Sequence, residues 1–189
     1  FAESLGLERD DDGLVVVDEA YTEFARPGTP SALTLLPGRP RLVVSRTMSK
    51  AFGMAGLRLG WITGPRQMIE EVMIHRDYNT ISVGMLDDHF AALALEHKDA
   101  ILARSQRITR GNLAILSDWV DNEPHVSWVK PKSGTTALLK YHLDMSSRDF
   151  CVELLKETGV LFTPGSALDM EGYARIGYAN GPEVLQAGL

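Results

Sequence analysis

The sequence Leu42-Val43-Val44-Ser45-Arg46-Thr47-Met48-Ser49-Lys50 (residues 42–50) joins a short apolar run to a polar segment that ends in a lysine. The apolar run is short and rich in β-branched residues, which predicts a buried strand. Similar apolar runs lie at residues 14–17 and 57–63. Continuous rather than alternating apolar strands are typical of parallel sheets that are covered on both faces. The first part of the chain is therefore predicted to be an α/β domain with a mainly parallel sheet.

The pattern changes along the rest of the chain. Residues 99–121 carry apolar side chains at helical spacing and predict one long helix, which could bridge two domains. The sequence then predicts a helix that begins at Ser146 and ends at Gly159, and short strands over residues 126–129, 135–141, 160–163 and 173–178. We expect three parts: residues 1–97 in a large domain, 98–123 as a connecting helix, and 124–189 as a small α+β domain.

Both ends of the sequence lack the usual signals. It begins at Phe1 without a methionine, and it stops at Leu189 inside a predicted helix that starts near Gly181. We interpret the chain as the C-terminal half of a longer protein, with the small domain truncated at its end. One hypothesis is therefore that these residues alone are an inactive fragment.

Composition excludes several classes of function. The net charge is −6, from 25 acidic and 19 basic residues, which gives no positive field for a nucleic acid. No apolar run approaches the roughly 20 residues that cross a bilayer, so no membrane partner is expected. The single cysteine, Cys151, allows no internal disulfide and is consistent with a cytoplasmic protein. The histidines, at positions 75, 89, 97, 125 and 142, show no metal-ligand spacing, so no metal is expected.

Asp18 and Tyr21 follow the apolar residues 14–17, at the C-terminal end of the first predicted strand. Ligands of open α/β sheets bind beyond that end of the strands. Both side chains are therefore candidates for ligand binding, although for Asp18 alone a helix cap or a solvated loop position is the simpler explanation.

Lys50 lies just after the second predicted strand, with hydroxyls at Thr47 and Ser49 and a guanidinium at Arg58. A lysine in such a position is usually a solvated surface residue. Here, however, two hydroxyls and a guanidinium form a possible cradle for phosphate, and Gly53 allows the backbone to approach a ligand closely. A lysine beside that cradle can form a Schiff base with an aldehyde cofactor.

Arg175 lies inside the apolar run of residues 173–178. A charge inside such a strand is costly unless it is paired. Two interpretations stay open: Arg175 is an outward-facing strand residue, or its guanidinium binds a substrate carboxylate through two hydrogen bonds.

Together, these motifs resemble the fold-type I, pyridoxal-phosphate-dependent aminotransferases of class I/II. Asp18-Glu19-Ala20-Tyr21, followed by Ser45 to Gly60 with its Thr-x-Ser-Lys and an arginine eight residues on, is similar to that family's cofactor-lysine segment. The strand around Arg175, preceded by Thr163-Pro164-Gly165-Ser166, resembles its carboxylate-binding end. The resemblance covers nearly the whole chain. It implies the aspartate aminotransferase-like fold, here the end of the large, mainly parallel-sheet domain plus a small α+β C-terminal domain.

The resemblance implies a role for each residue near the first two strands. Lys50 would hold pyridoxal 5'-phosphate as a Schiff base and, once displaced by substrate, would carry the proton between the substrate's Cα and the cofactor's C4′. Asp18 would pair with the pyridine nitrogen and keep it protonated. Tyr21 would hydrogen-bond the phenolic oxygen of the ring.

Phosphate and substrate contacts follow from the same resemblance. Thr47, Ser49 and Arg58 would hold the cofactor phosphate, and Arg175 would bind the α-carboxylate of the substrate. The implied reaction is ping-pong transfer of an amino group from an amino acid or amine to a 2-oxo acid, in a homodimer.

Within the family, residues 15–53 look most like histidinol-phosphate aminotransferase. Those enzymes resemble one another in an arginine that follows a Gly-Val-(apolar)₂ strand and meets the substrate phosphate. Here Gly159-Val160-Leu161-Phe162 is followed by Thr163, which looks more like the general amino-acid aminotransferases. Loss of one charge-assisted contact to phosphate costs about 1.5–3 kcal/mol, or roughly ten- to more than a hundredfold in affinity. Both substrate classes stay open.

Two other functions use the same fold. Capreomycidine-synthase-like proteins resemble this chain and carry out elimination or cyclisation on a basic amino acid. Some transcription regulators use an aminotransferase-like sensor domain behind a helix-turn-helix, but nothing basic or helix-turn-helix-like appears in these residues.

Overall fold

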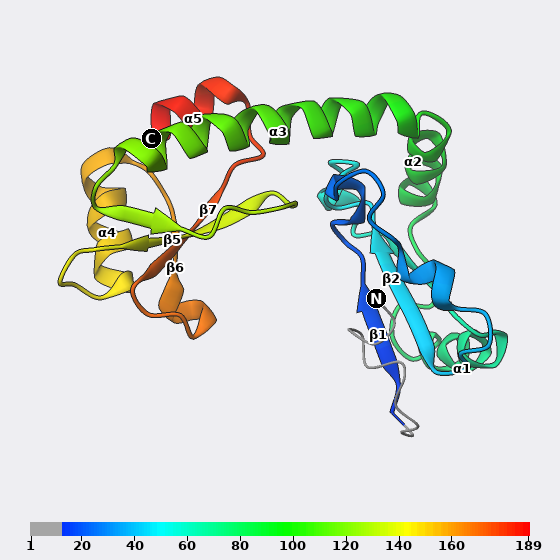
Figure 1. Cartoon of the computed structure of the whole chain (residues 1–189). Coiled ribbons are helices and arrows are strands. Elements are labelled where there is room, and N and C mark those ends of the chain that lie inside the picture. The colour runs from blue at the N-terminus through cyan, green and yellow to red at the C-terminus, as the bar shows by residue number, and fades with distance from the viewer. Residues whose placement is uncertain (1–12) are drawn as a thin grey trace. The chain divides into compact units, whose positions relative to one another are not determined.

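The computed structural model describes residues 13–189 and divides into two compact units, one up to Leu102 and one from Ala103 onward. Each unit contains its own sheet (Figure 1). The dividing point lies inside the long helix α3 (Lys98–Asn122), so most of that helix belongs to the second unit. The long helix predicted over residues 99–121 is therefore confirmed as an element.

The first unit contains a three-stranded sheet followed by two helices. The strands, in their order across the sheet, are β1 (Val15–Asp18), β2 (Leu42–Thr47) and β3 (Gly60–Thr63). The helices are α1 (Arg66–Arg76) and α2 (Met85–Glu96). The three strands lie where the apolar runs predict them, although β3 is shorter than its run.

β1 and β2 run parallel, with Asp18 beside Ser45 in the register. The central strand β2 is buried along its first three residues, as its continuous apolar run predicts. The outer strands are not covered on both faces in this unit, because Val16 of β1 is 58% exposed and Ile62 of β3 is 40% exposed.

β3 differs from the prediction of parallel strands, because it runs antiparallel to β2. The segment between them contains a 3₁₀ helix, η4 (Ala55–Leu57), and no α-helix that could carry the chain back for a parallel pairing. Gly60 begins β3 opposite Thr47, and a Cβ there would overlap the carbonyl oxygen of Arg46. The glycine therefore permits the start of β3 to approach the end of β2 closely.

A largely buried ion pair joins the C-terminal ends of β1 and β2. Glu19, which is 9% exposed, accepts hydrogen bonds from Nε and Nη2 of Arg46 at 3.1 and 2.8 Å. Its carboxylate also accepts bonds from the Ser31 hydroxyl at 2.8 Å and from the Ala32 amide at 2.6 Å. Ala32 begins the 3₁₀ helix η3 (Ala32–Leu35) of the connecting loop. One carboxylate thus links both strand ends and the loop between them.

Two carboxyl groups beside Arg46 have pKa values shifted in opposite directions. Burial by itself raises the pKa of Glu19, but hydrogen bonds from Arg46, Ala32 and Ser31 and the charge of Arg46 outweigh it, so the pKa lies below its ordinary value. Burial raises the pKa of Glu23, whose carboxylate lies 3.9 Å from Arg46. The depressed pKa of Glu19 means that its contribution to stability is present above the ordinary glutamate pKa and is lost as the pH falls through the folded-state value. Because the pKa of Glu23 is raised, its contribution to stability is present below the ordinary glutamate pKa and is lost as the pH rises through the folded-state value.

We predict that Glu19→Gln lowers the free energy of unfolding by about 1–3 kcal/mol at about pH 7, because it removes the nearer of the two carboxylates that pair with Arg46. The difference from the wild type should shrink as the pH falls through the depressed pKa of Glu19, because the wild-type carboxyl then loses its charge as well. Urea denaturation of both proteins at about pH 7 and about pH 3 measures the effect. A difference that did not change with pH would contradict the assignment.

The second unit contains a four-stranded sheet in the order β4-β5-β7-β6, with every pairing antiparallel. Besides α3, its elements in chain order are β4 (Val126–Trp128), β5 (Thr136–Tyr141), α4 (Ser147–Thr158), β6 (Thr163–Pro164), β7 (Tyr173–Gly177) and α5 (Pro182–Gly188). The unit is an α+β arrangement, as the sequence predicts.

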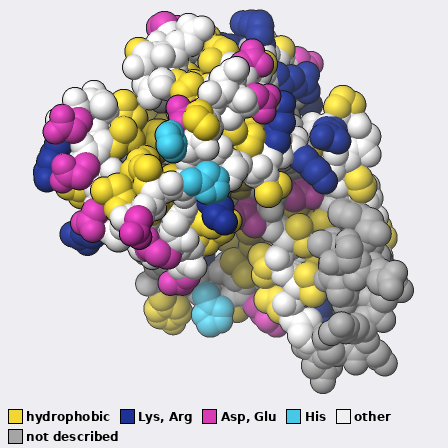
Figure 2. Space-filling model, turned by 60° about the vertical axis from the view of Figure 1, so that its left-hand side comes forward, with side chains coloured by type: hydrophobic (Ala, Val, Ile, Leu, Met, Phe, Trp, Pro, Cys, Tyr) yellow, Lys and Arg dark blue, Asp and Glu magenta, His cyan; other side chains and the backbone are white. Residues whose placement is uncertain are grey.

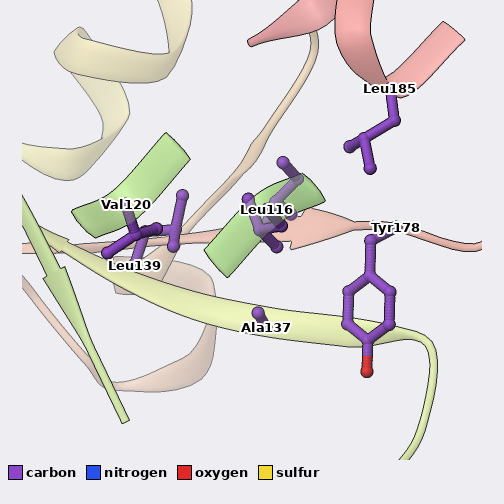
Figure 3. Packing of buried hydrophobic residues seen from close by; sticks show 7 residues of the cluster. Leu116, Val120, Ala137, Leu139, Tyr178 and Leu185 are labelled. Atoms are coloured by element: carbon purple, nitrogen blue, oxygen red, sulfur yellow. The ribbon is translucent and has the colours of Figure 1, made fainter. Parts of the chain in front are cut away.

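The helices of the second unit cover one face of its sheet. Buried side chains from α3, α5, β5 and β7 form its core (Figure 3): Leu116, Val120, Ala137, Leu139, Ile176, Tyr178 and Leu185. Tyr141 of β5 stacks on Phe150 of α4, with ring centres 4.6 Å apart. The alternate residues of β5, Thr136 and Lys140, are exposed. The opposite face of the sheet is therefore uncovered within this unit.

The predicted ends of α4 are confirmed, whereas the strand after it is shorter than predicted. The Ser146 hydroxyl accepts a hydrogen bond from the Asp149 amide at 3.1 Å, and Gly159 ends the helix in a left-handed conformation with φ 76°. The strand expected over residues 160–163 is reduced to β6, whose second residue is Pro164. β6 pairs with β7 only at Thr163 and Pro164, so residues 160–162 lie outside the ladder.

Asn112 is a polar residue among the buried side chains of α3. It is fully buried, and its Nδ2 donates to the carbonyls of Tyr178 and Asn180 at 2.8 and 2.7 Å. These two carbonyls lie just beyond β7, where the chain leaves the sheet. The amide therefore anchors the end of β7 to the helix.

We predict that Asn112→Ala destabilises the protein by about 2–4 kcal/mol, because it removes two hydrogen bonds and leaves buried carbonyl groups unpaired. Asn112→Asp should be at least as damaging, because a carboxylate would face those two carbonyls. Urea denaturation compares the variants with Arg110→Ala, a control at an exposed position of the same helix. A loss of stability no greater than in the control would refute the anchoring role.

The surface does not carry one dominant sign of charge on the face that Figure 2 shows, where acidic, basic and apolar side chains lie beside one another. Large apolar side chains are exposed in the first unit, among them Tyr78 and Met85. Within residues 13–189, none of the helices combines the length and the hydropathy that a membrane span requires.

Candidate active site

Lys50 lies on the loop after β2, and buried side chains hold the backbone of this loop in place. Met48, Ala51 and Phe52 are buried, and Met48 and Phe52 pack against Ala91 and its neighbours in α2. Lys50 lies between these anchors and is exposed. The loop backbone is closed by hydrogen bonds, such as the one from the Gly53 amide to the Lys50 carbonyl at 3.0 Å. The amine therefore reaches solvent from a backbone that the core holds in place.

Two hydroxyl groups lie together on the same loop. Oγ1 of Thr47 and Oγ of Ser49 are 3.0 Å apart, and the Ser49 amide donates to Thr47 Oγ1 at 3.1 Å. Gly53 has φ +69°, and no atom lies within 4 Å of the place where its Cβ would be. Two hydroxyls on one loop can donate hydrogen bonds to an anion such as phosphate.

Arg58 lies at the other end of this loop, just before β3. It adopts a left-handed backbone conformation with φ 50°, which is uncommon for a residue other than glycine. Its side chain is exposed, and Nη1 donates to the Ala55 carbonyl at 3.4 Å. The structure thus places Arg58 on the same loop as the hydroxyl pair, with its guanidinium turned to the backbone of η4.

Asp18 and Tyr21 flank the end of β1, as predicted. Asp18 is exposed and accepts hydrogen bonds from the Ala20 amide at 2.9 Å and from the Ser45 hydroxyl at 3.4 Å. Nζ of Lys50 lies 5.5 Å from the centre of the Tyr21 ring, within the range of a cation–π contact. Residues from two strand ends that are far apart in sequence are therefore neighbours.

Arg175 belongs to the second unit and lies in β7, opposite Leu138 of β5 and Thr163 of β6. Its neighbours Ala174 and Ile176 are buried, whereas Arg175 itself is exposed on the uncovered face of the sheet. Its Nη2 donates to the Thr163 hydroxyl at 3.2 Å. Arg175 is therefore an outward-facing strand residue with a guanidinium that is accessible to a ligand.

The first unit gathers a lysine, a tyrosine, a carboxylate and two hydroxyls beyond the C-terminal ends of β1 and β2, which is where open α/β sheets bind ligands. A primary amine combines with an aldehyde, hydroxyls and a guanidinium bind phosphate, and a carboxylate pairs with a protonated ring nitrogen. This set of groups fits a phosphorylated aldehyde that carries a nitrogen heterocycle.

Two residues that organise this region, Glu19 and Arg46, are absent from the candidates that sequence analysis selects. The sequence does contain a pattern that could have identified them. Glu19 follows Asp18 and Arg46 precedes Thr47, so two opposite charges lie at the ends of two strands that are predicted to be parallel. Strand alternation places their side chains on the other face from those candidates.

Cys151 and the histidines contribute no obvious chemistry. Cys151 is buried in α4, and burial raises the pKa of its thiol, so it stays protonated at neutral pH. Among residues 13–189, no three or more His, Cys, Asp or Glu side chains are grouped so that they could hold a metal ion.

Known proteins match this chain along nearly its whole length. The family model for aminotransferase class I and II matches residues 7–185. Capreomycidine synthase from Streptomyces vinaceus is 30% identical over 190 residues, which cover 99% of this chain and 48% of that protein. Histidinol-phosphate aminotransferase from Paenarthrobacter aurescens is 50% identical over 91 residues, which cover 48% of this chain and 24% of that protein.

A solved structure gives the same result. A PLP-dependent aminotransferase from Streptococcus suis 89-1591 superposes with a TM-score of 0.88 at 35% identity, over 99% of this chain and 48% of that one. The chain thus spans about half the length of the proteins that match its whole extent. The predicted fold, the C-terminal part of an aminotransferase, and the resemblance of one segment to histidinol-phosphate aminotransferase are confirmed. With a family-model match from residue 7 to residue 185, the chain belongs to the class I and II aminotransferase family.

Proposed function

We propose that this protein is a pyridoxal-phosphate-dependent aminotransferase, which moves an amino group from an amino acid or histidinol phosphate to a 2-oxo acid by a ping-pong mechanism. The observation that carries the proposal is the placement of Lys50. Its amine is exposed on a loop that buried Met48 and Phe52 hold, 5.5 Å from the Tyr21 ring. Membership of the aminotransferase family supports the same conclusion.

The groups of the loop after β2 fit the phosphate of this cofactor. The hydroxyls of Thr47 and Ser49 would donate hydrogen bonds to phosphate oxygens, and they already lie 3.0 Å apart. Arg58 would leave its weak bond to the Ala55 carbonyl and neutralise the phosphate charge. The open space beside Gly53 leaves room for the anion.

Pyridoxal phosphate, when bound, supplies an aldehyde that combines with amines and a ring that accepts electrons from the substrate's Cα. Lys50 would hold it through its amine and, after displacement by the substrate amine, would take the proton from Cα and deliver it to C4′ of the cofactor. Asp18 would bind the ring N–H and keep that nitrogen protonated. Tyr21 would donate a hydrogen bond to the phenolic oxygen of the ring.

Arg175 would bind the substrate's α-carboxylate. Its exposed guanidinium forms one bond to the Thr163 hydroxyl and has further N–H groups for a second, planar acceptor. Since Thr163 stands where a second cation would favour a phosphate, we propose an amino-acid donor, with histidinol phosphate as the other candidate.

A second candidate function is elimination or cyclisation on a basic amino acid at the same site. The similarity to capreomycidine synthase over 99% of the chain is the observation in its favour. Product analysis separates the two functions, because transamination requires a 2-oxo acid acceptor and the alternative does not. Turnover in the absence of any oxo acid would exclude simple transamination.

Assembly and location follow from the family resemblance. We propose a cytoplasmic homodimer in which further residues complete the site. The 189 residues alone are then expected to bind the cofactor weakly and to show no turnover.

We predict that Lys50→Ala abolishes the borohydride-reducible adduct between the full-length protein and pyridoxal phosphate, because no other amine occupies this position. Lys156→Ala is the control, since Lys156 is an exposed lysine that pairs only with Glu153 on α4. Mass spectrometry of the reduced protein measures the adduct. A normal yield of adduct in the Lys50 variant would disprove the central assignment.

We predict that amino acids such as arginine or glutamate convert the bound cofactor faster than histidinol phosphate does. Thr163→Arg should improve the affinity for histidinol phosphate about tenfold or more, because it adds a charge-assisted contact to phosphate beside Arg175. Thr163→Val, which removes only the hydroxyl, is the matched control. The absorbance of the bound cofactor follows each conversion. Rapid, saturable conversion of wild type by histidinol phosphate would instead favour a role in histidine biosynthesis.

A further inference from the structure

We propose that the Glu19–Arg46 ion pair is a positioning device for the candidate cofactor site, because it sets where β1 and β2 place Asp18 and Lys50. The inference rests on the proposed function, since it concerns the same site. Glu19 and Arg46 act through their neighbours in the chain, so they are positioning residues and not catalytic ones.

The ion pair and the candidate site lie on opposite faces of the same two strand ends. Successive residues of an extended chain point to opposite sides. Asp18 is exposed and shares its side with Ser45, whose hydroxyl donates to it at 3.4 Å. Glu19 and Arg46, each one position further along, are 9% and 21% exposed and bond to each other. Each partner is therefore one peptide unit away from a candidate residue, Asp18 in one strand and Thr47 in the other.

The backbone of Glu19 is held as firmly as its side chain. Its amide donates to the Ser45 carbonyl at 2.9 Å, and its carbonyl accepts from the Thr22 amide at 3.1 Å. This second bond closes the turn that carries Tyr21 toward Lys50. A displacement of Glu19 would therefore move Asp18 and Tyr21 together.

The ion pair is more demanding in geometry than an apolar contact. Nε and Nη2 of Arg46 both donate to Oε2 of Glu19, while the other oxygen, Oε1, accepts from the Ala32 amide. Directional bonds on both oxygens leave the carboxylate one orientation. Glutamine would keep the shape, but its NH₂ group must face one of these donors. A misplacement of about 1 Å at a reacting group can cost on the order of a hundredfold in rate, so the effect should be visible at the cofactor.

The test is a double-mutant cycle on the affinity of the full-length protein for pyridoxal phosphate. Glu19→Gln, Arg46→Gln and the double variant are titrated, well below their unfolding temperatures, by the absorbance of the Lys50-bound cofactor. We expect each single variant to weaken binding about tenfold or more, and the double variant to be no weaker than the weaker single variant. We also expect the variants to shift the pH midpoint at which the absorbance of the Lys50-bound cofactor changes. A loss of protein stability alone would not move this midpoint.

The control is Glu70→Gln, because the Arg66–Glu70 pair on α1 is 2.9 Å long, against 2.8 Å for Glu19–Arg46, but is 92% and 64% exposed. Its affinity should stay within about twofold of the wild type. If Glu19→Gln matched this control, or if the two single effects added fully in the double variant, the positioning role would be overturned.

Further outcomes distinguish failure of this inference from failure of the proposed function. If Glu19→Gln does not fold, Arg46→Lys takes its place, because it keeps the charge and loses the planar fork; unchanged affinity in that variant would overturn the inference. If the wild type shows no Lys50-dependent absorbance, the proposed function fails and the inference fails with it. Normal wild-type binding with unaffected variants would refute this inference alone.

Discussion

The hydrogen-bonded ion pair between Glu19 and Arg46 is the interaction on which the first unit depends. A carboxylate that is 9% exposed is costly to bury unless its oxygens are used, and here three residues donate to it. Because those donors come from β2 and from the loop before it, their bonds fix the end of β1 against two other segments. An apolar contact could not do this, since hydrophobic attraction has no preferred direction.

The loop after β2 shows how a reactive amine can be both fixed and accessible. Buried Met48 and Phe52 alternate with polar residues, so the core determines the path of the backbone and Lys50 is left at the surface. Gly60 contributes from the opposite side, because only a residue without a side chain can approach the Arg46 carbonyl where β3 returns. The path of the loop is therefore set by packing on one side and by backbone sterics on the other.

The two faces of the sheet in the second unit differ, because one is buried in the core and the other is exposed. α3 and α5 bury one face, and the amide of Asn112 anchors the end of β7 to it. The uncovered face carries Arg175 beside the Thr163 hydroxyl. Because Thr163 and Arg175 lie on the exposed face, the side chain at position 163 can be changed without disturbing the core on the other face.

The amino-acid sequence is sufficient to predict the elements and most of the candidate residues: the strands around Val16 and Val43, the long helix, the caps of α4 and the residues from Thr47 to Arg58. These follow from local patterns of hydrophobicity, capping and spacing. Three features are visible only in the folded structure: β3 runs antiparallel, Arg175 faces outward and Glu19 bonds Arg46. Such features depend on contacts between residues far apart in the chain, and local periodicity carries no information about which distant partner will supply a buried charge with its hydrogen bonds.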